Sequence, residues 1–160
     1  MISFADKMSI RMVLKSSDSS GLFEKNTPHD FTVQFDKLIH LEGYWTVALT
    51  EITLSYTHTS KRIGDVYVFS NICQGMFVGG TETSLLRKVH LSKDKTEQTG
   101  TKNRLKVQGQ IFSTPYYMPV RVAQMNQIHI YIKDSDGRPS SFLNEDVSVT
   151  LHFRKYPFLQ

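Results

Sequence analysis

The chain has 160 residues, a formal net charge of +4, and a composition that is 39% hydrophobic, 11% aromatic and 21% charged. This balance excludes an intrinsically disordered chain and is sufficient for one packed domain. The single cysteine, Cys73, excludes an intramolecular disulfide, so an intracellular origin is the expectation.

The N-terminal segment is the first in chain order. Asp6, Lys7 and Arg11 interrupt its apolar residues, so we expect no signal peptide. No run elsewhere approaches the roughly 18 apolar residues of a membrane span. We therefore expect residues 1–160 to form a single domain without a membrane span, in which about residues 1–8 are a candidate flexible arm.

Apolar residues then recur with a period of two, which is typical of β-strands. Residues 10–14 and 31–35 are short alternating runs. Residues 45–56 are apolar or β-branched on both parities, which predicts a central strand buried on both faces. Residues 66–71, 85–91 and 105–112 complete the middle of the chain, and the polar residues 92–104 predict an exposed loop.

The C-terminal part contains the clearest alternation. Isoleucines at every second position of residues 127–133 predict a strand with one buried face, and residues 147–154 repeat the pattern. Between them, residues 134–139 predict a hairpin turn in which Gly137 takes a positive φ. About eight strands without a long amphipathic helix predict an all-β sandwich of antiparallel strands, either a jelly roll or an immunoglobulin-like domain. The missing Cys…Trp…Cys spacing favours the jelly roll.

Residue types that carry chemistry are scattered. The six histidines, at positions 29, 40, 58, 90, 129 and 152, do not have zinc-site spacings. Cys73 has no neighbouring base in the sequence, which favours a small buried group over a nucleophile. We therefore expect no catalytic residue, no metal ligand and no cofactor, and the protein is not expected to be an enzyme.

Three further features have a structural and a functional interpretation. Gly79-Gly80 lacks the Lys-Ser/Thr of a phosphate-binding loop and predicts a turn. Asp134, Asp136 and Gly137 resemble a fragment of a calcium loop, but a turn is favoured. Glu51 is the one acid in an apolar strand, so we expect a buried carboxylate paired with an arginine or lysine.

Basic residues cluster between Lys88 and Lys106, at positions 88, 93, 95, 102, 104 and 106. Such a cluster could contact phosphates, but no aromatic residues that would stack on bases are interleaved with it. A solvated loop is the favoured interpretation, and a weak contact with nucleic acid is the alternative.

Three stretches together resemble a known protein family. The first comprises NT at 26–27, FTVQF at 31–35 and IHLEGYWTVALTEI at 39–52. The second comprises VYVFSNI at 66–72, FVG at 77–79 and LLR at 85–87. The third comprises YMPV at 117–120, Ile128, Ile130, DG at 136–137 and VSVTLHFR at 147–154. In this order they resemble the minor capsid, or penton, proteins of Maverick/Polinton elements and adintovirus-like viruses, from Asn26 to Arg154. Gly80 and residues 144–146 depart from the pattern.

This resemblance implies a single jelly roll that assembles as a homopentamer at the fivefold vertices of an icosahedral capsid, beside a double-jelly-roll major capsid protein. It implies a virion location, preceded by an intracellular stage in the nucleus or cytoplasm of the host. Trp45, Glu51 and Phe153 would then have structural roles, and the interface residues remain unknown. Two other classes stay open: a glycan- or receptor-binding jelly-roll module, and a nucleic-acid-binding protein.

Overall fold

The computed structural model describes residues 2–3, 8–57, 64–91 and 105–156. Twelve strands form within these ranges, and no helix does. They are β1 (Ile2–Ser3), β2 (Ser9–Lys15), β3 (Asp30–His40), β4 (Trp45–Thr57), β5 (Asp65–Ser70), β6 (Met76–Val78), β7 (Thr81–Thr83), β8 (Leu85–His90), β9 (Leu105–Ile111), β10 (Met118–Pro119), β11 (Gln124–Asp134) and β12 (Leu143–Lys155). All eight segments that the alternation predicts as strands are strands, although their ends differ by up to five residues.

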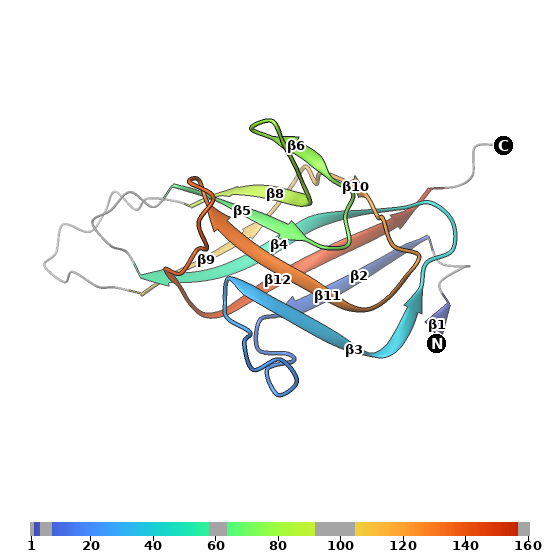
Figure 1. Ribbon diagram of the computed structural model, residues 1–160, viewed down its shortest axis with the longest axis horizontal. Coiled ribbons are helices and arrows are strands. Elements are labelled where there is room, and N and C mark those ends of the chain that lie inside the picture. The colour runs from blue at the N-terminus through green and yellow to red at the C-terminus, as the bar shows by residue number, and fades with distance from the viewer. Residues whose placement is uncertain (1, 4–7, 58–63, 92–104, 157–160) are drawn as a thin grey trace, which may run out of the picture.

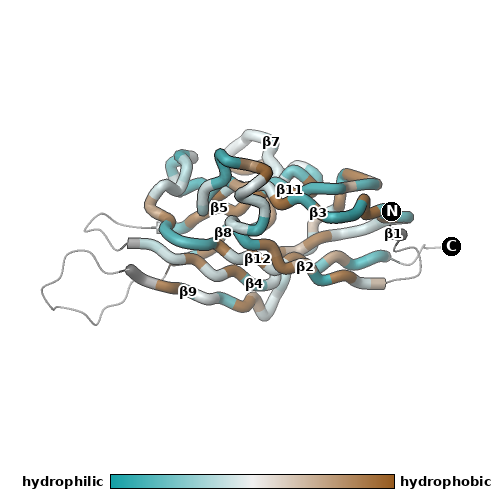
Figure 2. The backbone as a smooth tube through the Cα atoms, turned by 90° about the horizontal axis from the view of Figure 1, so that it is seen from below, coloured by the Kyte–Doolittle hydropathy of each residue, from teal (hydrophilic) through white to brown (hydrophobic). Residues whose placement is uncertain are grey.

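The strands form two stacked layers (Figure 1). Sheet A has the order β1-β3-β11-β5-β8, and sheet B has the order β10-β4-β12-β2. Two strands, β10 and β9, lie one after the other along the same side of β4. β10 pairs with Thr46 and Val47, and β9 pairs with the residues from Glu51 to Thr57. Figure 2 shows the two layers edge-on, with the hairpin β6–β7 projecting from sheet A on the side away from sheet B.

The pairing is nested along the chain. β2 pairs with β12, β3 with β11, β4 with β9 and β5 with β8, and each of these pairs is antiparallel. The first long strand therefore lies beside the last one, and the two innermost strands lie beside each other. Alternate pairs belong to alternate sheets, so the chain crosses repeatedly between the two layers.

The core lies between the layers and is built from alternate residues of the long strands. Sheet A contributes buried side chains that include Phe31, Val33, Val68, Ile128, Ile130 and Ile132. Sheet B contributes Val47, Leu49, Ile52, Leu54, Val149, Leu151 and Phe153. Each fully buried aliphatic or aromatic side chain stabilises the fold by about 1.5–3 kcal/mol, which is why the period-two pattern decides the layering.

A β-bulge in β4 reverses which residues of that strand face the core. Thr150 pairs with Glu51 while Leu151 pairs with Leu49, so Thr50 is an extra residue opposite β12. Before the bulge the odd residues Val47 and Leu49 are buried, and after it the even residues Ile52 and Leu54 are buried. Glu51 is exposed on the outer face. The expectation of a buried, ion-paired Glu51 is therefore wrong, because it rests on burial of residues 45–56 on both faces, whereas the outer face is open to solvent at Glu51.

The turn after β11 closes as predicted but does not make a hairpin within one sheet. Gly137 has φ 76° and donates its N–H to the carbonyl of Asp134 at 3.1 Å. The Asp134 carboxylate accepts the N–H groups of Asp136 and Arg138, both at 2.9 Å, so this carboxylate holds the turn. β11 then belongs to sheet A and β12 to sheet B, so the expected hairpin is a crossover between sheets.

Gly79 and Gly80 form the predicted turn, with φ 57° and 81°, and that turn joins β6 to β7. The predicted loop of residues 92–104 lies outside the described residues. Ile2 and Ser3 of the candidate N-terminal arm pair in parallel with Ile39 and His40.

Candidate interaction surfaces

The described residues hold no arrangement typical of a catalytic or metal site. No group of three His, Cys, Asp or Glu side chains gathers within the described ranges, and His58 lies outside them. The Cys73 thiol is buried and donates to the carbonyls of Ser70 and Ser84, at 3.4 and 3.2 Å. Burial raises the pKa of Cys73 to about 11, so the thiol stays protonated near neutral pH and is a poor nucleophile.

Of the three residues expected to be structural, two are buried. The side chain of Trp45 is 2% exposed, and its indole N–H donates to the carbonyl of Glu42 at 3.0 Å. Phe153 is fully buried in the central strand β12. Glu51 lies on the outer face of sheet B, as described above. Within the described part of the chain, no helix has the length and apolar character needed to span a bilayer.

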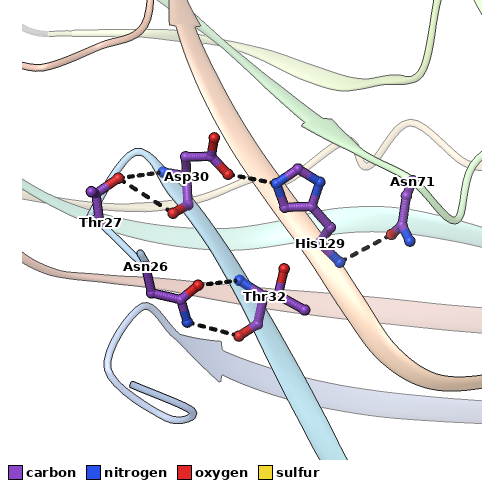
Figure 3. Close-up of polar contacts among 6 residues, drawn as sticks. All are labelled: Asn26, Thr27, Asp30, Thr32, Asn71 and His129. Carbon is purple, nitrogen blue, oxygen red and sulfur yellow. Dashed lines mark hydrogen bonds and ion pairs between the residues drawn. The ribbon is translucent and has the colours of Figure 1, made fainter. Parts of the chain in front are cut away.

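The outer face of sheet A carries a polar network (Figure 3). Asp30 Oδ1 and His129 Nε2 lie 2.5 Å apart, and the backbone N–H of His129 donates to Asn71 Oδ1 at 3.0 Å. The Asn26 carboxamide bonds both the N–H and the carbonyl of Thr32, at 3.0 and 2.9 Å. These contacts attach the loop before β3 to the sheet. An open pocket beside them is lined by residues 21–26, 30 and 32.

Next to this network lies an aromatic stack. The rings of Phe69 and Tyr131 lie 4.9 Å apart and almost parallel, and the Lys133 ammonium lies over both rings, 5.6 and 5.5 Å from their centroids. Phe69 is only 7% exposed, so this stack packs against its surroundings and does not offer a free aromatic platform. Phe77, on the neighbouring hairpin β6–β7, is 74% exposed.

The predicted basic cluster is only partly described. Lys88 Nζ lies 3.1 Å from Asp65 Oδ2, and His90 Nδ1 lies 2.6 Å from Asp65 Oδ1. Hydrogen bonds from His90 and then from Lys88 hold the pKa of Asp65 below its usual value. Residues 93, 95, 102 and 104 lie outside the described ranges. The described end of the cluster is therefore already paired with a carboxylate.

The outer face of sheet B carries three exposed aliphatic side chains. One row across its four strands consists of Val13, Thr150, Glu51 and Ile111, each paired with the next. Val13 is 61% exposed and Ile111 is 77% exposed. Val107 lies four residues before Ile111 on β9 and is 61% exposed as well. Gln108 and Gln110 occupy the alternate positions of that strand. β9 thus turns its aliphatic side chains toward the outside.

The neighbouring row of the same face is basic. Arg11 pairs with His152, and Arg154 follows two residues along β12 on the same face. The Tyr117 hydroxyl lies 2.7 Å from His152 Nδ1, and the Arg154 guanidinium lies 4.8 Å from the centroid of the Tyr117 ring. Burial, then the charges of Arg11 and Arg154, lower the pKa of His152. Among the described residues, neither arginine has a carboxylate partner.

Sequence reasoning missed both of these surfaces. The sequence predicts residues 105–112 as a strand without assigning its faces, and in the structure Val107 and Ile111 are exposed. The basic row combines residues that are more than 100 positions apart in the chain, and only the pairing of β2 with β12 brings them together.

Comparisons with known proteins give a match of fold. No protein-family model matches the sequence, and no curated protein matches it. The crystal structure of the selenomethionine-labelled mavirus penton protein is similar, with a TM-score of 0.60 and 6% sequence identity over 92% of this chain and 100% of that chain. The infectious bursal disease virus VP2 subviral particle matches more weakly, with a TM-score of 0.21 and 12% identity over 92% of this chain and 33% of that chain.

Proposed function

We propose that this chain is a structural minor capsid protein of penton type, a single jelly roll that forms the fivefold vertices of an icosahedral capsid. The observation that carries the proposal is the nested strand pairing, combined with a fold match that extends over the whole length of the mavirus penton protein. In this proposal the chain acts as an assembly subunit and not as an enzyme. Its partners are further copies of itself and a major capsid protein, and its location is the virion after an intracellular stage.

The strand order supports the jelly roll within the all-β class. The eight long strands lie as β2-β12-β4-β9 in one sheet and β3-β11-β5-β8 in the other. This is the order that results when an antiparallel ribbon of four strand pairs is rolled into two sheets, which builds two Greek keys. An immunoglobulin-like domain does not pair its first and last long strands as the outermost of a series of nested pairs.

The two sides of the sandwich support assembly into a ring. A ring needs a heterologous interface, in which one surface of each copy contacts a different surface of the next copy. Here one side of the sandwich ends in β2 and β1, whereas the other side ends in β8 and β9. These sides differ in strand length and side chains, so they provide two distinct surfaces on each copy.

Mass photometry and negative-stain electron microscopy of the purified chain test the proposal. Five copies of the 18.4 kDa chain give a particle of about 92 kDa, and we expect rings of fivefold symmetry in micrographs. Co-expression with a double-jelly-roll major capsid protein then tests incorporation into shells. A chain that stays monomeric at high concentration and does not join shells refutes the proposal.

A glycan-binding module is the second candidate, because the polar outer face of sheet A adjoins an open pocket. The pocket wall includes Asp30 and Thr32, and both residues lie in the network that contains His129. Jelly rolls also occur among lectins, which bind ligands through such polar surfaces. A glycan array probed with the labelled chain tests this candidate, and an array without any saturable signal removes it.

A further inference from the structure

The basic row of sheet B offers two arginines to a ligand. Arg11 and Arg154 come from neighbouring antiparallel strands, and both are exposed on the same face. Arg154 stacks on Tyr117, and Tyr117 is hydrogen-bonded to His152, so one of the two guanidinium groups is held in place. Exposed arginines that are not ion-paired bind carboxylates and phosphates well, because their planar donors match those groups.

The apolar row lies directly beside the basic row. Val13 follows Arg11 by two residues on β2, so the two side chains point to the same face about 7 Å apart. Ile111 lies at the other end of this row, beyond Thr150 and Glu51, and Val107 extends the aliphatic side chains along β9. Three exposed aliphatic side chains on one face of a small domain are a common property of protein-binding surfaces.

The charges on this face indicate the kind of partner. Its described side chains include the cations Arg11, Lys15 and Arg154 and the carboxylate Glu51, while the exposed carboxylate of Asp146 on β12 accepts from the hydroxyls of Ser16 and Ser17. A second copy of the chain docked face to face would bring like charges together, which is unfavourable. Nucleic acid would satisfy the arginines but would leave Val13 and Ile111 without apolar contacts, and the one aromatic ring in the basic row is already engaged by Arg154.

We propose that the outer face of sheet B is a docking site for an acidic segment of another protein whose carboxylates bind Arg11 and Arg154 and whose apolar side chains cover Val13 and Ile111. In an extended segment, residues i and i+2 point to the same side about 7 Å apart, which matches the spacing of the two rows. This docking site goes beyond the capsid role. Peptide binding tests the docking site, and mass photometry of the unmodified chain tests the ring, so the failure of one proposal can be told apart from the failure of the other.

The experiment measures the fluorescence anisotropy of a short fluorescein-labelled peptide that alternates aspartate with valine. We expect saturable binding that weakens about tenfold in the double variant Arg11→Gln with Arg154→Gln. We expect a loss of about tenfold in Ile111→Ser as well, because one aliphatic contact is removed. The matched control, Lys37→Gln with Arg138→Gln, removes the same charge from exposed positions elsewhere and should bind like the unmodified chain.

His152 provides an independent readout by NMR. A carboxylate bound between the arginines offsets their charges, so peptide binding should raise the pKa of His152. The groups facing His152 are Arg11 on β2, Arg154 on β12 and Tyr117 before β10, with Glu51 in the next row of β4. An asparagine-for-aspartate peptide should leave this pKa unchanged.

Four results would each overturn the proposal. The first is an absence of peptide binding, and the second is an equal loss of binding in the matched control. The third is that the aspartate peptide does not bind whereas oligothymidine binds and Ile111→Ser leaves that binding intact. The fourth is a change of oligomeric state in Ile111→Ser, which would show that the face joins copies of the chain. Thermal unfolding checks that each variant folds. If Ile111→Ser does not fold, Val13→Ser replaces it, since it lies in the same row.

Discussion

The β-bulge at Thr50 can be tested by exchanging the chemistry of two consecutive residues of β4. The structure places Glu51 outside and Ile52 inside, where Ile52 is 1% exposed. In a regular strand that continued the parity of Val47 and Leu49, residue 51 would face the core and residue 52 would face outward. The variants Glu51→Ile and Ile52→Glu therefore have opposite expected effects on the free energy of unfolding under the two arrangements.

The magnitudes follow from burial. Replacing exposed Glu51 by isoleucine should change the free energy of unfolding by no more than about 0.5 kcal/mol. Ile52→Glu loses about 1.5–3 kcal/mol of apolar burial and leaves a carboxylate without a partner in the core, which costs several kcal/mol more. We expect this variant to lose at least about 4 kcal/mol, a large part of the stability of a domain. Ile52→Leu is the matched control and should cost less than about 1.5 kcal/mol.

Denaturant unfolding followed by tryptophan fluorescence measures these changes. The chain has one tryptophan, Trp45, which begins β4 and is 2% exposed, so its emission reports on the same strand. Equal m-values are required for the comparison of midpoints. If Glu51→Ile raised the free energy of unfolding by about 2 kcal/mol or more while Ile52→Glu were well tolerated, the bulge and the outward Glu51 would be wrong.

Three further outcomes are expected. The raised pKa of Cys73 stabilises the fold by about 2–3 kcal/mol below pH 9, and this contribution is lost as the pH rises through about 11. In denaturant titrations, the difference in the free energy of unfolding between the unmodified chain and Cys73→Ala should shrink over that pH range. The lowered pKa of His152 means that the unfolded chain binds more protons, so stability should fall as the pH drops below about 6.5, and His152→Gln should reduce this slope. Phe153→Ala should cost about 3–5 kcal/mol by calorimetry, because removal of the fully buried ring leaves a cavity between the two sheets; a loss below about 1 kcal/mol would contradict its place in the core.

Strands were predictable from the sequence because a strand with one buried face has apolar residues at every second position. This period-two pattern identifies β11, where Ile128, Ile130 and Ile132 are all buried. It misleads at β4, because a single extra residue reverses the parity and the pattern contains no mark of the bulge. The hairpin β6–β7 has strands of only three residues, too short for a period to be recognised.

The candidate surfaces were much less predictable than the strands. In β9 the aliphatic side chains of Val107 and Ile111 are exposed, while Gln108 donates to the carbonyl of His90 at 2.9 Å. The basic row depends on the register that aligns Arg11 with His152, and a shift of one residue would turn those side chains to opposite faces. Surfaces made from distant strands require the register, which a single sequence does not contain.

The position of β12 has a consequence for how the protein is made. This strand lies between β2 and β4, although it is the last of the described strands to be synthesised. Until about residue 155 has emerged, β2 and β4 have no strand between them and sheet B cannot close. Such distant pairing makes folding slow, since long stretches of chain must be ordered before the contacts form. Sheet B therefore closes only after β12 has been made, and unpaired strand edges stay open to aggregation until then.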